Sequence, residues 1–225
     1  MLLQEAGTRN YHLIQLDTKM PENYEQAISY RSKAIYYNSD KFSNVDVNGA
    51  PLPTYHHHAG HGRYIVYAAL RNKASNETFT FVSVHLSSSR EKWKKREKEI
   101  GVILNTLKRL DNFPETVVIG GDFNSFGPIR SPKQRSGVHS ILSSAGYTHM
   151  IALADEKENT NLSSIRRLKS SRPGTIGTHL DGIYMSTEPS EVKRYALPGK
   201  NRVSDHAFVV AEVFTHPKPI KRVRD

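Results

Sequence analysis

The stretch TVVIGGDFN, residues 116–124, carries the strongest indication of fold and function in this chain. A short run of β-branched residues that ends at Gly-Gly predicts a buried strand, Thr116–Gly120, opening into a loop. Asp122 and Asn124 follow, so a carboxylate and a carboxamide lie where ligands gather in layered α/β proteins. Gly, Asp and Asn are also the residues that turns prefer, so this segment alone leaves both a turn and a site open.

Length and composition predict one globular domain, residues 1–216, followed by a basic tail, 217–225. The chain has 225 residues, of which 37% are hydrophobic. Its 32 Lys and Arg against 22 Asp and Glu give a formal charge of +10, which favours polyanionic partners such as nucleic acid, phosphoinositides or anionic membrane surfaces. A soluble protein that is merely basic is the alternative.

Residue types that are missing exclude several classes of protein. The absence of cysteine excludes disulfides and thiol catalysis. No apolar run has the length of a membrane span, so we expect no stable membrane insertion. The first residues do not form a signal peptide, but Leu2 and Leu3 resemble a strand, and the chain is therefore expected to lack its natural beginning. Secreted and cytoplasmic locations, and the oligomeric state, stay open.

Apolar stretches rich in Val, Ile, Tyr and Phe predict several strands. They are Ala34–Tyr37, Tyr64–Leu70, Thr78–Leu86, Thr116–Gly120, Leu180–Met185 and Ala207–Phe214. Two segments, 49–62 and 155–177, are predicted to be mobile. The first contains a histidine run, 56–58, which indicates a flexible loop or, as the alternative, a transition-metal site with His61.

Helical periodicity is clearest between the third and fourth predicted strands. Ile100, Ile103, Leu104 and Leu107 have i, i+3, i+4, i+7 spacing and predict a helix over Arg90–Leu110. Its charged first half, EKWKKREKE, is interpreted as a solvated face with Glu-Lys pairs, or as a polyanion contact. A second helix is predicted over 138–145, ended by Gly146. This order of elements favours mixed sheets covered by helices.

Polar residues recur at the ends of the predicted strands. They are Glu5, His85, Asp122, Asn124, Asp181, Asp205 and His206. A single strand histidine is more often part of a core, but together these residues form a set of acids, an amide and imidazoles. Carboxylates of this kind suit Mg²⁺ or Mn²⁺, which prefer oxygen ligands.

These motifs carry a resemblance to a known family. QE near the start, SVHL, GGDFN, HLDGIY and the late SDH occur in the order and approximate spacing of the endonuclease/exonuclease/phosphatase superfamily. The segment Gln4–Gly7 and the region of Arg63 also resemble the B subunit of cytolethal distending toxin. The resemblance implies an α/β (α+β) fold, a four-layer sandwich of two mixed β-sheets flanked by helices, with the site at one sheet edge.

The resemblance also implies roles for individual residues. Glu5 and Asp205 are similar to the metal carboxylates of the family, which use Mg²⁺ or Mn²⁺. Asp122 and Asn124 are similar to the pair that positions the phosphate and the attacking water. The family begins with a core strand that carries an Asn, and this strand is expected to be missing before Glu5 or to be supplied otherwise; its loss would leave the sheet short of a central member.

The resemblance implies a proton-transfer pair and two phosphate contacts as well. His206 is similar to the general base, oriented by Asp181. His85 is similar to the histidine of the nucleases that contacts the phosphate or protonates the leaving group, and Arg63 to a phosphate-binding arginine. Secreted nucleases carry a Glu near the position of Arg31, so the partner of His85 is left unassigned.

The function expected from these residues is metal-dependent hydrolysis of nucleic acid phosphodiester bonds, with DNA as the first substrate. Attack by water, assisted by a His-Asp base, needs neutralised charge on the phosphate. RNA is also open as a substrate. The alternatives are a phosphoinositide phosphatase or sphingomyelinase of the same superfamily, and a catalytically impaired fragment that binds polyanions by charge alone.

Overall fold

The fold is given by a computed structural model of the protein. The described residues are 2–3, 20–45, 55–58, 64–88, 93–109, 116–125, 137–154, 156–157, 181–195 and 210–215. The predicted site residues Glu5, Arg63, Asp205 and His206 and the predicted tail 217–225 lie outside them.

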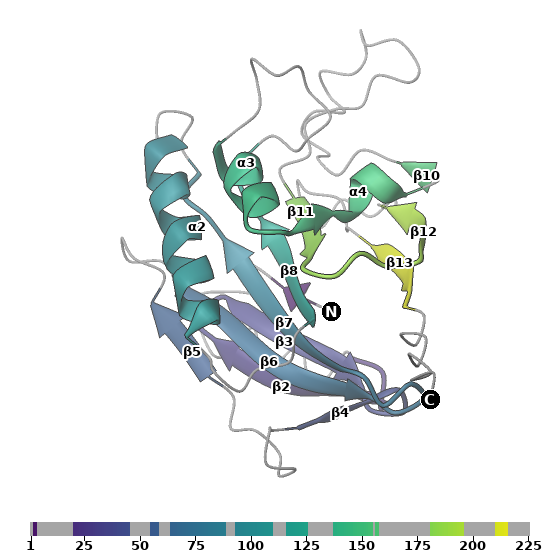
Figure 1. The fold of residues 1–225 in the computed structure, drawn as a ribbon. Coiled ribbons are helices and arrows are strands. Elements are labelled where there is room, and N and C mark those ends of the chain that lie inside the picture. Colours follow the sequence, from purple (N-terminus) through teal and green to yellow (C-terminus); the bar gives the residue numbers. More distant parts are fainter. Residues whose placement is uncertain are drawn as a thin grey trace, which may run out of the picture.

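A seven-stranded mixed sheet forms the centre of the molecule (Figure 1). Its strand order is β4-β6-β7-β8-β11-β9, and β5 pairs with β6. The strands are β4 (Phe42–Asn44), β5 (Tyr55–His58), β6 (Tyr64–Asn72), β7 (Thr78–His85), β8 (Thr116–Asp122), β9 (Thr148–His149) and β11 (Asp181–Met185). β7 and β8 are parallel, as expected for strands connected through a helix, whereas the other pairs are antiparallel.

Two smaller sheets accompany the central one. The first is β1 (Leu2–Leu3), β2 (Tyr24–Tyr30) and β3 (Lys33–Asn38); the second is mixed and contains β10 (Glu156–Lys157), β12 (Glu191–Tyr195) and β13 (Ala211–Phe214). The first sheet packs on the central sheet, since Ile28 and Ile35 share an apolar cluster with Val66 and Leu70 of β6. This face of the central sheet is therefore buried between sheets.

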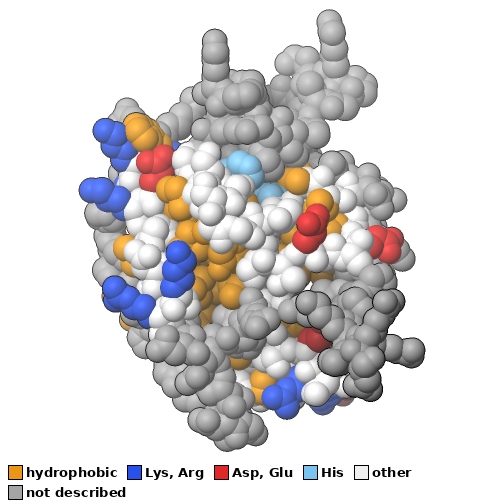
Figure 2. Space-filling view, in the orientation of Figure 1, with side chains coloured by type: hydrophobic (Ala, Val, Ile, Leu, Met, Phe, Trp, Pro, Cys, Tyr) orange, Lys and Arg blue, Asp and Glu red, His pale blue; other side chains and the backbone are white. Residues whose placement is uncertain are grey.

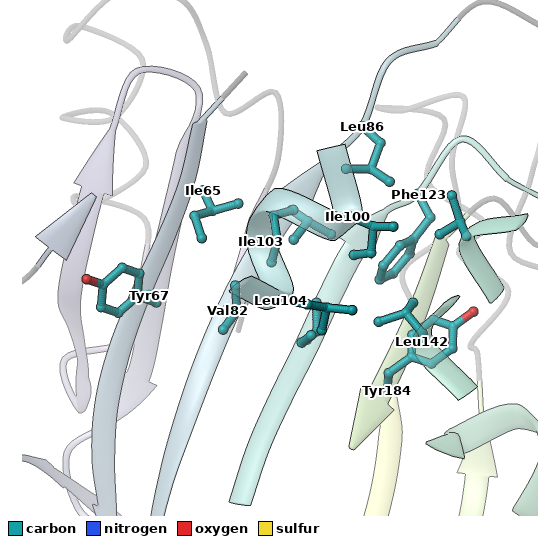
Figure 3. Packing of buried hydrophobic residues seen from close by; sticks show 13 residues of the cluster. Ile65, Tyr67, Val82, Leu86, Ile100, Ile103, Leu104, Phe123, Leu142 and Tyr184 are labelled. Atoms are coloured by element: carbon teal, nitrogen blue, oxygen red, sulfur yellow. The ribbon is translucent and has the colours of Figure 1, made fainter. Parts of the chain in front are cut away.

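Helices cover the opposite face. α2 (Trp93–Lys108) and α3 (Gly137–Ser144) lie across β7 and β8 (Figure 1), and Figure 3 shows Ile100 and Ile103 directed into the core that they share with Val82. The short α4 (Met150–Leu153) packs in a separate cluster with β11 and β12. None of the helices in the described ranges has the length and apolar character needed to cross a membrane.

The predicted architecture is confirmed, with corrections at particular segments. The predicted strands overlap β3, β6, β7, β8, β11 and β13. The predicted helices correspond to α2 and α3, and Gly146 follows α3 with φ +87°, a conformation that glycine adopts without strain. Part of the segment predicted to be mobile was interpreted wrongly: residues 55–58 form β5, because pairing with β6 satisfies their backbone groups.

Gly182 of β11 provides a test of packing behind the site. A Cβ at this position would lie 2.9 Å from His149 Nε2 and 3.3 Å from Phe123 Cε2, so Gly182→Ala should destabilise the protein by about 1–3 kcal/mol through overpacking. Gly101 of α2 has nothing within 4 Å of its Cβ position, so Gly101→Ala should instead stabilise it by about 0.5–1 kcal/mol. Urea unfolding measures both changes, and equal effects would contradict the packing around Gly182.

Candidate active site

Strand register brings three of the predicted site residues into one row. His85 pairs in register with Asp122 across β7 and β8, and Asp122 pairs with Asp181 across β8 and β11. Side chains that are register partners point to the same face of a sheet. For Asp122 this is the face of Val118 and Gly120, opposite α2 and α3, and a Cβ on Gly120 would lie 2.6 Å from Leu2 Cδ1.

The row lies at one end of the central sheet. It is the carboxyl end of β7 and β8 and the first residue of β11. His85, Asp122 and Asp181 are 7%, 9% and 9% exposed, so their polar groups are removed from most of the solvent while the sheet end keeps them near the surface. Electrostatic interactions at such a position are stronger than in bulk water.

Asn124 is fixed against Asp122 by the loop that follows β8. Its backbone N–H donates to Asp122 Oδ1 at 2.7 Å, and its Nδ2 donates to Asp122 Oδ2 and to the carbonyl of Leu86, each at 3.0 Å. Asn124 has φ +48°, a conformation that Asn tolerates better than most residues. The amide therefore bridges the loops after β7 and β8 and holds the Asp122 carboxylate in one orientation.

His85 has a carboxylate partner that the sequence left unassigned. His85 Nε2 lies 3.7 Å from Asp122 Oδ2. A carboxylate at this distance can orient the imidazole, and an imidazole N–H can donate a hydrogen bond to a phosphate oxygen. The pair is thus suited to contact the oxygens of a phosphate ester.

α2 supports both site loops through two buried charged residues. Glu99, 0% exposed, accepts from the Ser87 backbone N–H at 2.9 Å and from Ser87 Oγ at 2.7 Å. Arg96, 6% exposed, donates from Nη1 to the Ser87 carbonyl and from Nε to Ser125 Oγ, each at 3.1 Å. One turn of helix thereby holds the loop after β7 and the loop after β8 at fixed positions.

Burial lowers the pKa of the Arg96 guanidinium from its ordinary value, and the charges of Glu99 and Asp122 oppose that shift. Arg96 therefore interacts electrostatically with Asp122 of the row as well as with its own helix. The interpretation of EKWKKREKE as a solvated face was wrong for Arg96 and Glu99. The signal that could have found them is their spacing, since they continue the buried stripe of Ile100 and Ile103 toward the start of the helix.

The structure thus brings together four of the predicted site residues, His85, Asp122, Asn124 and Asp181. The other four, Glu5, Arg63, Asp205 and His206, lie outside the described residues, and their roles stay predictions.

The donor set of the described residues fits a hard metal ion in part. Within the described ranges, no group of three or more acidic, histidine or cysteine side chains could hold a metal by itself. Asp181 is an oxygen donor of the type that Mg²⁺ prefers, but both oxygens of Asp122 already accept hydrogen bonds from Asn124. A metal at this edge would therefore need oxygen ligands in addition to Asp181.

Comparison with known proteins places this fold among solved structures. Neither a family model nor a curated protein sequence matches the chain. The mannosyl-6-phosphatase Bt3783 of Bacteroides thetaiotaomicron superposes with a TM-score of 0.64 at 18% identity, covering 91% of this chain and 81% of that one. An endonuclease/exonuclease/phosphatase family protein of the same organism gives 0.65 at 17% identity, over 91% and 77% of the two chains. The human Nocturnin catalytic domain, solved with a bound sulfate anion, gives 0.59 at 14% identity, over 93% and 78%.

The chain has the fold of the endonuclease/exonuclease/phosphatase proteins. The resemblance carried by QE, SVHL, GGDFN and SDH is thereby confirmed at the level of the fold. The solved structures of this fold include phosphatases and TDP2 proteins, so the fold alone does not select one substrate.

Proposed function

We propose that this protein is a metal-dependent phosphoesterase that hydrolyses phosphodiester bonds of nucleic acid, with DNA as the favoured substrate. The observation that carries the proposal is the row His85–Asp122–Asp181, with Asn124 bonded to Asp122, at one end of the central sheet. An acid, an amide and an imidazole at one edge are the groups that ester hydrolysis by water requires.

In this proposal each side chain has a defined task. Asn124 and Asp122 position the phosphate and the attacking water, and His85 donates to the phosphate or to the leaving oxygen. His206 accepts a proton from the attacking water, and Asp181 orients the imidazole of His206. Glu5 and Asp205 would hold a Mg²⁺ or Mn²⁺ ion, which would supply charge neutralisation at the phosphate. Arg63 contacts the same phosphate.

The surface charge supports a polyanionic substrate. Figure 2 shows Lys and Arg side chains along the edge formed by α2. This helix carries Lys94, Lys95, Lys98 and Lys108, and Arg109 follows it. Together with the formal charge of +10, these residues favour a nucleic acid over a neutral substrate.

A plasmid-nicking assay tests the proposed activity. With Mg²⁺ the protein should convert supercoiled plasmid to the nicked form, and EDTA should abolish the conversion, because the phosphate charge is then no longer neutralised. His206→Ala, made in the same protein, controls for a contaminating nuclease and should also be inactive. Persistent nicking with EDTA or with His206→Ala would contradict the proposed metal or base.

A phosphatase acting on a phosphomonoester is the second candidate. The observation that favours it is the superposition with a mannosyl-6-phosphatase, a protein named for a sugar phosphate. Hydrolysis of a sugar phosphate or phosphoinositide by a protein that leaves plasmid intact would select this candidate. Salt-sensitive DNA binding without any turnover would instead indicate a catalytically impaired polyanion-binding protein.

A further inference from the structure

Arg31, at the turn between β2 and β3, packs against the rings of Tyr30 and Tyr64. Its Cζ is 4.3 Å from the centroid of the Tyr64 ring and 5.6 Å from that of Tyr30. The two tyrosine rings are themselves 5.0 Å apart. The N–H groups of a guanidinium point outward in its own plane. When the face of the guanidinium packs on a ring, these N–H groups stay available to bind a phosphate.

The Tyr64 ring of this group lies next to the row of site residues along the sheet. β6 and β7 pair antiparallel with Val66 opposite Ser83, and the same register continued by two residues places Tyr64 beside His85. Tyr64 lies on the face of Val66, which packs against the sheet that contains β2 and β3. Tyr64 and His85 thus end neighbouring strands, which are about 4.8 Å apart, and the guanidinium that packs on Tyr64 is one strand further along the row than His85.

The backbone at Arg31 is strained. Its φ is +54°, in the left-handed region that hairpin turns usually fill with Gly, Asn or Asp. Arg31 is also exposed, so burial of the side chain does not explain the residue. Strain that persists at an exposed position next to a candidate site indicates a requirement for the side chain itself.

We propose that Arg31 binds a second phosphate of a nucleic acid strand, next to the phosphate that lies over His85 and Asp122. The Tyr30 and Tyr64 rings hold the guanidinium at the edge of the site, so that the protein binds two successive phosphates. This inference rests on the proposed phosphodiesterase function, and it narrows the substrate to a chain with more than one phosphate.

Two substrates separate this role from catalysis. Arg31→Gln should raise KM for an oligonucleotide about tenfold or more, because a charge-assisted contact is lost. The same variant should leave kcat/KM for bis(4-nitrophenyl) phosphate, which has a single phosphate, unchanged. The matched control is Lys41→Gln, an exposed cation between β3 and β4, at the end of β3 opposite to Arg31, and it should affect neither substrate.

Binding measured without turnover keeps the test independent of the proposed activity. Fluorescence anisotropy of a labelled phosphorothioate oligonucleotide, titrated in EDTA over a range of salt, gives the slope of log K against log salt. Arg31→Gln should reduce its magnitude by about 0.7, the value for one single-strand phosphate contact, and Lys41→Gln should not. Arg31→Gly, which relieves the strained φ, should lose the contact with no fall in thermal midpoint.

Equal KM and equal salt slopes for Arg31→Gln and Lys41→Gln would overturn the proposal. So would a loss of activity that is the same for both substrates, since Arg31 would then act on the reacting phosphate or on folding. If the wild type cleaves neither the oligonucleotide nor bis(4-nitrophenyl) phosphate, the proposed function is refuted. The anisotropy slopes would still show whether Arg31 contacts a phosphate.

Discussion

Asp122→Asn is expected to lower the turnover of a phosphodiester substrate by about 10²–10⁴-fold. The Asp122 carboxylate accepts from the backbone N–H and the Nδ2 of Asn124 and lies 3.7 Å from His85 Nε2. An amide in its place carries no charge for His85 and must turn an NH₂ group toward one of these donors. The measurement is kcat with Mg²⁺ on a labelled oligonucleotide.

Two controls separate chemistry from folding. Asp40→Asn changes an exposed carboxylate that bonds Asn23 Nδ2 at 2.8 Å, far from the row, and should keep full activity. His85→Ala combined with Asp122→Asn should cost little more than either change alone, because groups that act as a unit are not additive. If Asp122→Asn is folded and as active as the wild type, the row is not the catalytic centre.

Glu99→Ala is expected to have the largest effect on stability, a loss of about 3–5 kcal/mol. The substitution removes the acceptor of the Ser87 N–H and hydroxyl, and it removes the negative charge that acts most strongly on the buried Arg96. Activity should fall as well, because Ser87 and Ser125 belong to the loops that carry the site. Urea unfolding gives the change in the free energy of unfolding.

Neighbouring substitutions test the cause of this loss. Lys98→Ala, an exposed position of the same helix, should change stability by less than about 0.5 kcal/mol. Replacing Arg96 and Glu99 together by Met should recover part of the stability, since no charge is then buried, but not all of it, since the Ser87 N–H still lacks an acceptor. A cost for Glu99→Ala no larger than that of Lys98→Ala would show that Glu99 does not hold the loop.

The sequence by itself determined the elements whose signals are local. The run Thr116–Ile119 and the spacing of Ile100, Ile103 and Leu104 indicated β8 and α2 because strand and helix each expose a fixed periodicity. The motif GGDFN indicated that polar side chains lie at the end of this strand. These signals need only residues that are close along the chain.

The tertiary structure decided everything that depends on pairing between distant segments. Register alone aligns His85 with Asp122 and Asp122 with Asp181, and a shift by one residue would turn the side chains to the other face. Burial of Arg96 and Glu99 follows from where α2 crosses the ends of β7 and β8, which composition cannot show. The physical reason is that register and burial arise from contacts between strands and helices far apart in sequence, whereas periodicity arises within each element.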